Sequence, residues 1–146
     1  MNMKPIVLIG LLSLSLASTA FGQSGCNIKA LEARKDVKRA MLDAAANTNH
    51  DGREHAFAVT TDGIVQSPEG TGGQVNVIVP TGTIALFHTH PSSGLNQPSA
   101  TDIVNLIALQ TKRPGVCSYV LGHTHAEMQT VFEIFPDGST KMVSFF

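Results

Sequence analysis

The densest group of chemically active side chains in this sequence lies between His88 and Asp102. His88 and His90 are two residues apart, Ser99 and Asp102 are three apart, and residues 91–98 separate the two pairs. Two histidines and one aspartate leave one position open on a tetrahedral zinc ion, which is typical of catalytic rather than structural sites. The open position would hold a water molecule, so the pattern predicts a metal-dependent hydrolase. If no metal binds, the remaining sequence indicates only a small exported domain.

A strand predicted over residues 83–89 would position the two histidines. Side chains alternate between the two faces of a strand, so Leu86, His88 and His90 share one face. At about 3.3 Å per residue, the two histidine Cα atoms lie roughly 6.6 Å apart, close enough for both rings to contact one ion. Pro91 has no N–H group to donate and ends the strand.

A helix predicted over residues 99–112 would position the aspartate. Ser99 is a favourable N-cap and Asp102 is the third helical residue, so the pair also fits a purely structural capping box. However, Asp102 lies on one helical stripe with Leu106 and Leu109. A carboxylate on an inward face needs a partner, and a metal held by two histidines would supply one.

The other elements follow from periodicity and turn signals. Three- and four-residue spacing of apolar side chains predicts a helix over residues 28–46, followed by a loop over 47–53. Strands are predicted over 56–60, 64–66, 75–79, 116–121, 128–135 and 141–146, with turns at Asp62-Gly63 and Asp137-Gly138. Alternation of helices and strands in this order predicts a single α/β domain, with one mixed sheet flanked by helices.

The first 22 residues have the features of a secretory signal peptide. Lys4 precedes an apolar run over residues 6–17, and Ala20-Phe21-Gly22 places small residues as a signal peptidase requires. Residues 23–146 would then form the mature domain in the periplasm or outside the cell, without a stable membrane span. The alternatives are an uncleaved membrane anchor and lipidation at Cys26.

The cysteines and the net charge further narrow the class of protein and the kinds of partner expected. Cys26 and Cys117 are the only two cysteines, and an even pair in an exported protein is a candidate disulfide. A net charge of −1 and a pI near 6.6 argue against nucleic acid as a partner.

The histidine, serine and aspartate spacing resembles the signature of the JAMM (JAB/MPN) metallopeptidases. That signature has an upstream glutamate, then His-x-His-Pro, a short loop and Ser-x-x-Asp. The resemblance implies a cytidine-deaminase-like fold, Zn²⁺ on His88, His90 and Asp102, and Ser99 as stabiliser of the tetrahedral intermediate. The chain departs from the pattern by one residue, because eight residues separate His90 from Ser99 where seven are usual.

The resemblance also requires a glutamate that acts as acid and base. The glutamates before the motif are Glu32, Glu54 and Glu69. Glu54 is the match by position, because the family places this residue on the strand after the first helix. Glu32 lies among other charges of a predicted helix and Glu69 lies in a predicted loop, and Glu54 itself could be an ordinary surface carboxylate.

These features predict an exported zinc metallopeptidase that cleaves peptide or isopeptide bonds, with cell-wall peptides or envelope proteins as possible substrates. The alternatives are an inactive binding or scaffold module of the same fold, and a delivered effector or toxin with the same chemistry. A second His-x-His, at His123 and His125, lacks a nearby Ser-x-x-Asp and is interpreted as a polar loop. His50 and His55 are likewise interpreted as loop residues.

Overall fold

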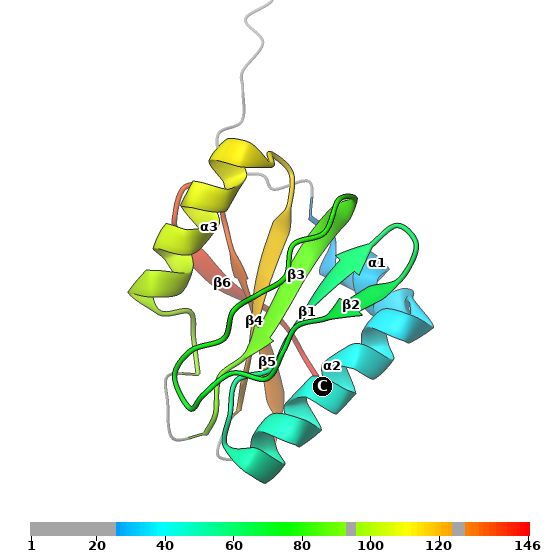
Figure 1. Ribbon diagram of the computed structural model, residues 1–146, viewed down its shortest axis with the longest axis vertical. Helices are drawn as coiled ribbons and strands as arrows, with labels where there is room; N and C mark the ends of the chain where they lie inside the picture. The colour runs from blue at the N-terminus through cyan, green and yellow to red at the C-terminus, as the bar shows by residue number, and fades with distance from the viewer. Residues whose placement is uncertain (1–25, 93–95, 124–127) are drawn as a thin grey trace, which may run out of the picture.

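The computed structural model describes residues 26–92, 96–123 and 128–146. The predicted signal peptide lies outside these residues. The elements, in chain order, are α1 (Ile28–Ala33), α2 (Lys35–Asp51), β1 (Ala56–Thr60), β2 (Ile64–Gln66), β3 (Thr83–Thr89), α3 (Ala100–Lys112), β4 (Cys117–His123), β5 (Gln129–Ile134) and β6 (Thr140–Phe145). They form one small α/β domain around a mixed six-stranded sheet (Figure 1).

The strand order in the sheet is β2-β1-β3-β4-β5-β6. Among the described strand pairs, β3 and β4 are parallel and every other neighbouring pair is antiparallel. Parallel neighbours need a crossover connection, and α3 supplies it. The carboxyl end of β3 therefore lies beside the amino end of α3, the arrangement that builds ligand sites in open α/β sheets.

The helices α1 and α2 cover one face of the sheet, and α3 covers the other (Figure 1). On the α1–α2 side, Phe57, Phe87 and Tyr119 stack across β1, β3 and β4 with ring centroids 4.9 and 4.8 Å apart. On the opposite side, Leu106 of α3 packs on the sheet in a smaller cluster. The side chains of β3 thus alternate between the two faces of the sheet, as predicted. Ala85 and Phe87 lie on the α1–α2 side, and Leu86 lies on the α3 side.

The prediction of one helix over residues 28–46 and a loop over 47–53 is wrong at two points. Arg34 is extended, with φ −75° and ψ 123°, and separates α1 from α2. Its guanidinium donates to the Thr60 carbonyl at 2.9 Å and pairs with Asp36 at 2.6 Å, which fixes it between the helices. The second helix continues to Asp51 because Thr48 packs against the sheet, and it ends where Gly52 adopts a left-handed conformation with φ 69°.

The predicted strand over residues 75–79 is also wrong. The segment belongs to no strand, although β2 is an edge strand of the sheet and pairs only with β1. Its backbone is held by side chains instead: Ser67 accepts from the Ile78 N–H at 2.8 Å, and Arg113 donates to the Val79 carbonyl at 2.8 Å. Its valines pack flat on the sheet rather than pairing along its edge.

The other predicted strands and the second predicted helix are confirmed. The strands over 56–60, 64–66 and 83–89 have the predicted bounds, and the three C-terminal strands differ by one or two residues at their ends. The predicted helix over 99–112 is α3, with Ser99 as its N-cap. Positive φ at Gly138 completes the predicted turn before β6.

Cys26 and Cys117 form a disulfide with Cα atoms 5.8 Å apart, as the paired cysteines predict. The bond ties Cys26, two residues before α1, to the first residue of β4, at the centre of the sheet. Within the described residues, no helix combines the length and apolar character needed to cross a membrane.

Candidate metal centre

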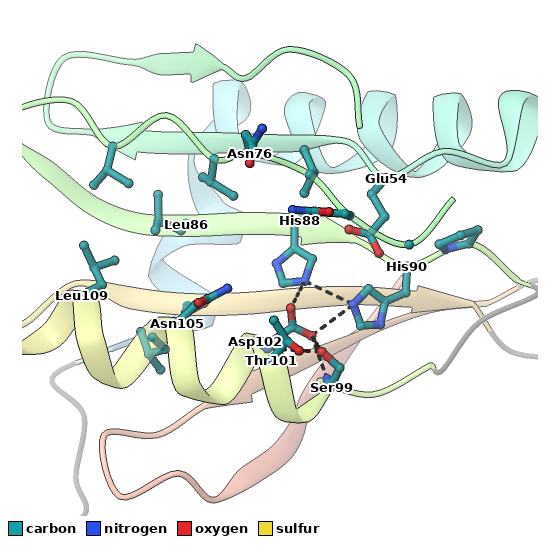
Figure 2. Close-up of a pocket in the computed structure, with 18 of the residues that line it drawn as sticks. Glu54, Asn76, Leu86, His88, His90, Ser99, Thr101, Asp102, Asn105 and Leu109 are labelled. Atoms are coloured by element: carbon teal, nitrogen blue, oxygen red, sulfur yellow. Dashed lines mark hydrogen bonds and ion pairs between the residues drawn. The ribbon is translucent and has the colours of Figure 1, made fainter. Parts of the chain in front are cut away.

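The side chains of His88, His90 and Asp102 converge at the carboxyl end of β3 (Figure 2). His88 Nε2 lies 3.1 Å from Asp102 Oδ1, and His90 Nε2 lies 3.2 Å from Asp102 Oδ2. The two Nε2 atoms are 3.2 Å apart. Ligand atoms held about 2.0–2.1 Å from one tetrahedral zinc ion lie about 3.3 Å from one another, so this spacing fits a shared ion. The group can therefore hold a metal ion.

The two neighbouring elements bring these ligands together. His88 is on β3, and His90 directly follows the strand, where its N–H donates to the Leu121 carbonyl of β4 at 2.9 Å. Asp102 comes from the first turn of α3. The ligands converge although the loop between His90 and Ser99 has eight residues, so the additional residue does not separate the two halves of the motif.

Asp102 serves the helix as well as the cluster. The side chain of Ser99 accepts from the Asp102 N–H at 3.2 Å, and Asp102 Oδ2 accepts from the Ser99 N–H at 2.7 Å, which together form the predicted capping box. Burial of Asp102 raises its pKa, but hydrogen bonds from His88 and His90 outweigh this effect and hold the pKa well below its usual range. The carboxylate is therefore ionised, which is the form that binds a cation.

Ser99 is held by the same capping box. Its hydroxyl donates to Asp102 Oδ2 at 2.8 Å, so its one proton is engaged in the cap. The structure thus places Ser99 beside the proposed ligands, and it assigns the hydroxyl a structural bond there.

Glu54 lies at the entry to β1 and is 7% exposed. Its backbone is fixed on both sides by the following loop, because its N–H donates to the Thr71 carbonyl at 2.7 Å and its carbonyl accepts from the Gly70 N–H at 2.9 Å. Its side chain lines the same cavity as the three ligands (Figure 2). Burial raises the pKa of Glu54, and the nearby histidines offset only part of that effect.

The raised pKa of Glu54 has a consequence for the metal-free protein. A buried carboxyl whose pKa is raised by folding stabilises the fold while it is protonated, and this contribution is lost as the pH rises through the folded-state pKa. We expect Glu54→Gln to unfold at higher urea concentration than wild type at pH 7, and the difference to shrink as the pH falls below the usual range of a glutamate. Urea denaturation of metal-free protein between pH 4 and 8 measures this.

Glu69→Gln is the matched control, because Glu69 is exposed and pairs with Arg53 on the surface. It should change the unfolding midpoint little at any pH. If Glu54→Gln instead destabilises the metal-free protein at pH 7, the folded state favours the charged carboxylate. That result would contradict a Glu54 pKa raised by burial.

A buried hydroxyl network behind the ligands was missed by the sequence analysis. Thr89, between the two histidines, faces the opposite side of β3 and shares a hydrogen bond of 2.5 Å with Thr48 of α2. Its Oγ1 also accepts from the His55 N–H at 2.8 Å, and its own N–H donates to the His55 carbonyl at 2.9 Å. Because His55 follows Glu54, this network fixes the Glu54 backbone relative to the ligand strand. The available signal was a polar residue on a face otherwise formed by Ala85 and Phe87.

The ligands lie in a cavity of about 730 Å³. One wall is the segment from Gly72 to Val79, the opposite wall is α3, and the floor includes Leu86 and Ser118 of the sheet. A cavity of this size accommodates a small molecule or a few residues of an extended chain.

The remaining sequence candidates do not join the cluster. Glu32 lies on α1 and does not line the cavity, and Glu69 pairs with Arg53. His50 is the penultimate residue of α2 rather than a loop residue, while His55 precedes β1 and contacts Asp51 at 2.8 Å. His123 ends β4 and contacts Gln129, and His125 lies outside the described residues.

No protein-family model matches this sequence, and no curated protein has significant sequence similarity to it.

Proposed function

We propose that this chain is an exported zinc-dependent hydrolase that cleaves peptide or isopeptide bonds. The observation that carries the proposal is the convergence of two imidazoles and one carboxylate within 3.2 Å, in a cavity that also contains the buried Glu54. Two nitrogen ligands and one oxygen ligand, with the cavity open to further ligands, form the donor set of a catalytic rather than a structural zinc site.

The proposed chemistry divides between the metal and Glu54. Zn²⁺ bound by His88, His90 and Asp102 would supply a Lewis acid and lower the pKa of water to about 7. Glu54 would accept the proton of the attacking water and pass it to the leaving amine. A carboxyl whose pKa is raised towards the working pH suits both steps, because it can take up and release a proton.

Ser99 would stabilise the oxyanion that forms from the substrate carbonyl. For this step its hydroxyl proton must turn from Asp102 Oδ2 towards the cavity, since a serine hydroxyl has one proton to donate. The backbone N–H of Ser99 would still donate to Asp102 Oδ2 and maintain the cap.

The JAMM-like assignment is part of this proposal. Its support is the order of the elements: helices first, Glu54 at the start of β1, the ligand histidines at the end of β3, and Ser99 and Asp102 at the start of α3. The disulfide supports export, because such bonds persist in oxidising compartments.

Glu54→Gln separates metal binding from hydrolysis. Zinc-loaded protein starting at Gln23 would be incubated with a mixed peptide library and with peptidoglycan fragments, and cleavage followed by mass spectrometry. We expect Glu54→Gln to retain zinc and to cleave at least about 100-fold more slowly, because a general base contributes about 10²–10⁴-fold. Glu69→Gln serves again as the control and should cleave at the wild-type rate.

One observation favours an alternative, an inactive binding module. In the structure the Ser99 hydroxyl is engaged by Asp102 rather than presented to the cavity. A wild-type protein that binds zinc and these peptides without cleaving them would support that alternative and contradict the hydrolase.

A further inference from the structure

We infer that the cavity beside the metal centre selects substrates with an uncharged aliphatic side chain next to the carbonyl that is attacked. This inference rests on the proposed function, and it adds a substrate class that the metal centre alone does not specify. It follows from the distribution of charge, apolar side chains and neutral amides along the cavity.

Charge is confined to one end of the cavity. Among the described lining residues, the ionisable side chains are Glu54, His88, His90 and Asp102, and all four belong to the candidate metal centre. In the part of the chain that the structure describes, no lysine, arginine, aspartate or glutamate lines the rest of the cavity. Arg113 lies nearby, but its guanidinium donates to the Val79 and Pro80 carbonyls and holds the wall in place. A charged substrate side chain would therefore enter this region without a counter-ion, which is costly.

The end away from Glu54 and Ser99 is apolar. Leu86, on the floor, precedes His88 by two residues on the same face of β3, so it is the next side chain along the cavity (Figure 2). Leu109 of α3 and the valines Val77 and Val79 of the opposite wall pack with it in one cluster. Leu86 and His88 are two residues apart, about 6.6 Å along β3, so a side chain on the residue next to the reacting carbonyl would extend towards this cluster.

The polar side chains between these ends are neutral. Asn76 lies on one wall and Asn105 on the other, one turn along α3 from Asp102 (Figure 2). Each amide can donate and accept hydrogen bonds without carrying charge. They can therefore bind the main-chain amides of an extended substrate on either side of the aliphatic residue, while leaving its side chain to the leucines and valines.

Hydroxamates test this inference by binding rather than by turnover. A hydroxamate anchors to zinc, so an attached amino-acid side chain probes the cavity beside the metal. The compounds are acetohydroxamate, which has no side chain, and the hydroxamates of N-acetyl-leucine, N-acetyl-lysine and N-acetyl-aspartate. Isothermal titration of zinc-loaded wild type should give about tenfold tighter binding of the leucine compound than of acetohydroxamate, since burying a leucine side chain contributes at least that much. The lysine and aspartate compounds carry the same N-acetyl amide as the leucine compound, and they should bind at least about tenfold more weakly than it does.

A variant on the cavity wall completes the test. Leu109→Asp should weaken the leucine compound about tenfold and strengthen the lysine compound, while acetohydroxamate binds as before. Leu42→Asp is the matched control, because Leu42 is 46% exposed on α2, on the opposite side of the sheet. Leu109→Ala, a milder change, should weaken the leucine compound less and keeps the test informative if the aspartate variant does not fold.

The outcomes separate the two proposals. If acetohydroxamate binds but all side chains bind equally, or if a charged compound binds best, the aliphatic subsite is overturned while the metal centre stands. If acetohydroxamate does not bind and direct titration shows no zinc binding, both proposals fail.

Discussion

His88→Ala should abolish stoichiometric zinc binding by the mature protein. His88 supplies one of three converging ligand atoms, and its Nε2 lies 3.2 Å from that of His90 and 3.1 Å from Asp102 Oδ1. Alteration of groups that merely orient metal ligands costs about 10–100-fold in affinity, so loss of a ligand itself should cost more than about 100-fold. Isothermal titration with ZnCl₂ and metal analysis of dialysed protein both measure this.

His50→Ala is the control for that experiment. His50 is an exposed imidazole on α2 and does not belong to the cluster, so its removal should leave affinity and stoichiometry unchanged. Asp102→Asn adds a further comparison, because the asparagine can still cap α3 but carries no charge. It should retain the helix and weaken zinc binding. Wild-type affinity in His88→Ala would mean that zinc binds elsewhere and would overturn the assignment of the metal centre.

Removing the disulfide should produce the largest loss of stability. Cys26 and Cys117 are 91 residues apart, and closing a ring of that length removes conformational entropy from the unfolded chain worth about 4.6 kcal/mol. That is a large part of the roughly 5–15 kcal/mol by which domains are stable. The double variant Cys26→Ala/Cys117→Ala should therefore unfold at much lower urea concentration than oxidised wild type.

The chain contains its own control for this prediction, because it has two cysteines and both are in the bond. Reduced wild type should unfold close to the double variant, and reductant should leave the double variant unchanged. Equal urea midpoints of unfolding for oxidised wild type and the double variant would contradict the prediction. They would show that the disulfide does not stabilise the fold by reducing the conformational entropy of the unfolded chain. Zinc should stabilise the oxidised and crosslink-free forms alike at saturation if both bind it equally well.

The residues of the candidate metal centre could be predicted because their placement is local. Strand alternation over residues 88–90 put His88 and His90 on one face, and helical spacing over residues 102–109 turned Asp102 inward, so both depend only on short stretches of sequence. Ser99 as N-cap followed from the same local rules. The assignment of Glu54 to the cavity depended on the resemblance, since nothing in its immediate sequence distinguishes it from other carboxylates.

The errors involve contacts between distant parts of the chain. Arg34 leaves the helical conformation where its guanidinium meets a carbonyl 26 residues away, and helical periodicity carries no information about that contact. The segment 75–79 has the composition of a strand, but its backbone bonds to the side chains of Ser67 and Arg113 and its valines pack on the sheet, contacts that its own sequence does not show. The Thr48–Thr89 contact joins residues 41 positions apart and likewise could not be predicted from local sequence.

The division of the cavity between separate segments bears on how such a domain can change during evolution. The three proposed ligands lie in one strand–loop–helix unit, whereas the wall from Gly72 to Val79 belongs to a different connection. Connections outside strands and helices accept substitutions and insertions more readily than the elements they join. Under the proposed function, replacing that wall would alter substrate preference while the three proposed ligands stay in place. The loop between His90 and Ser99 would accept fewer sequence changes, because its two ends must keep the proposed ligands within reach of one ion.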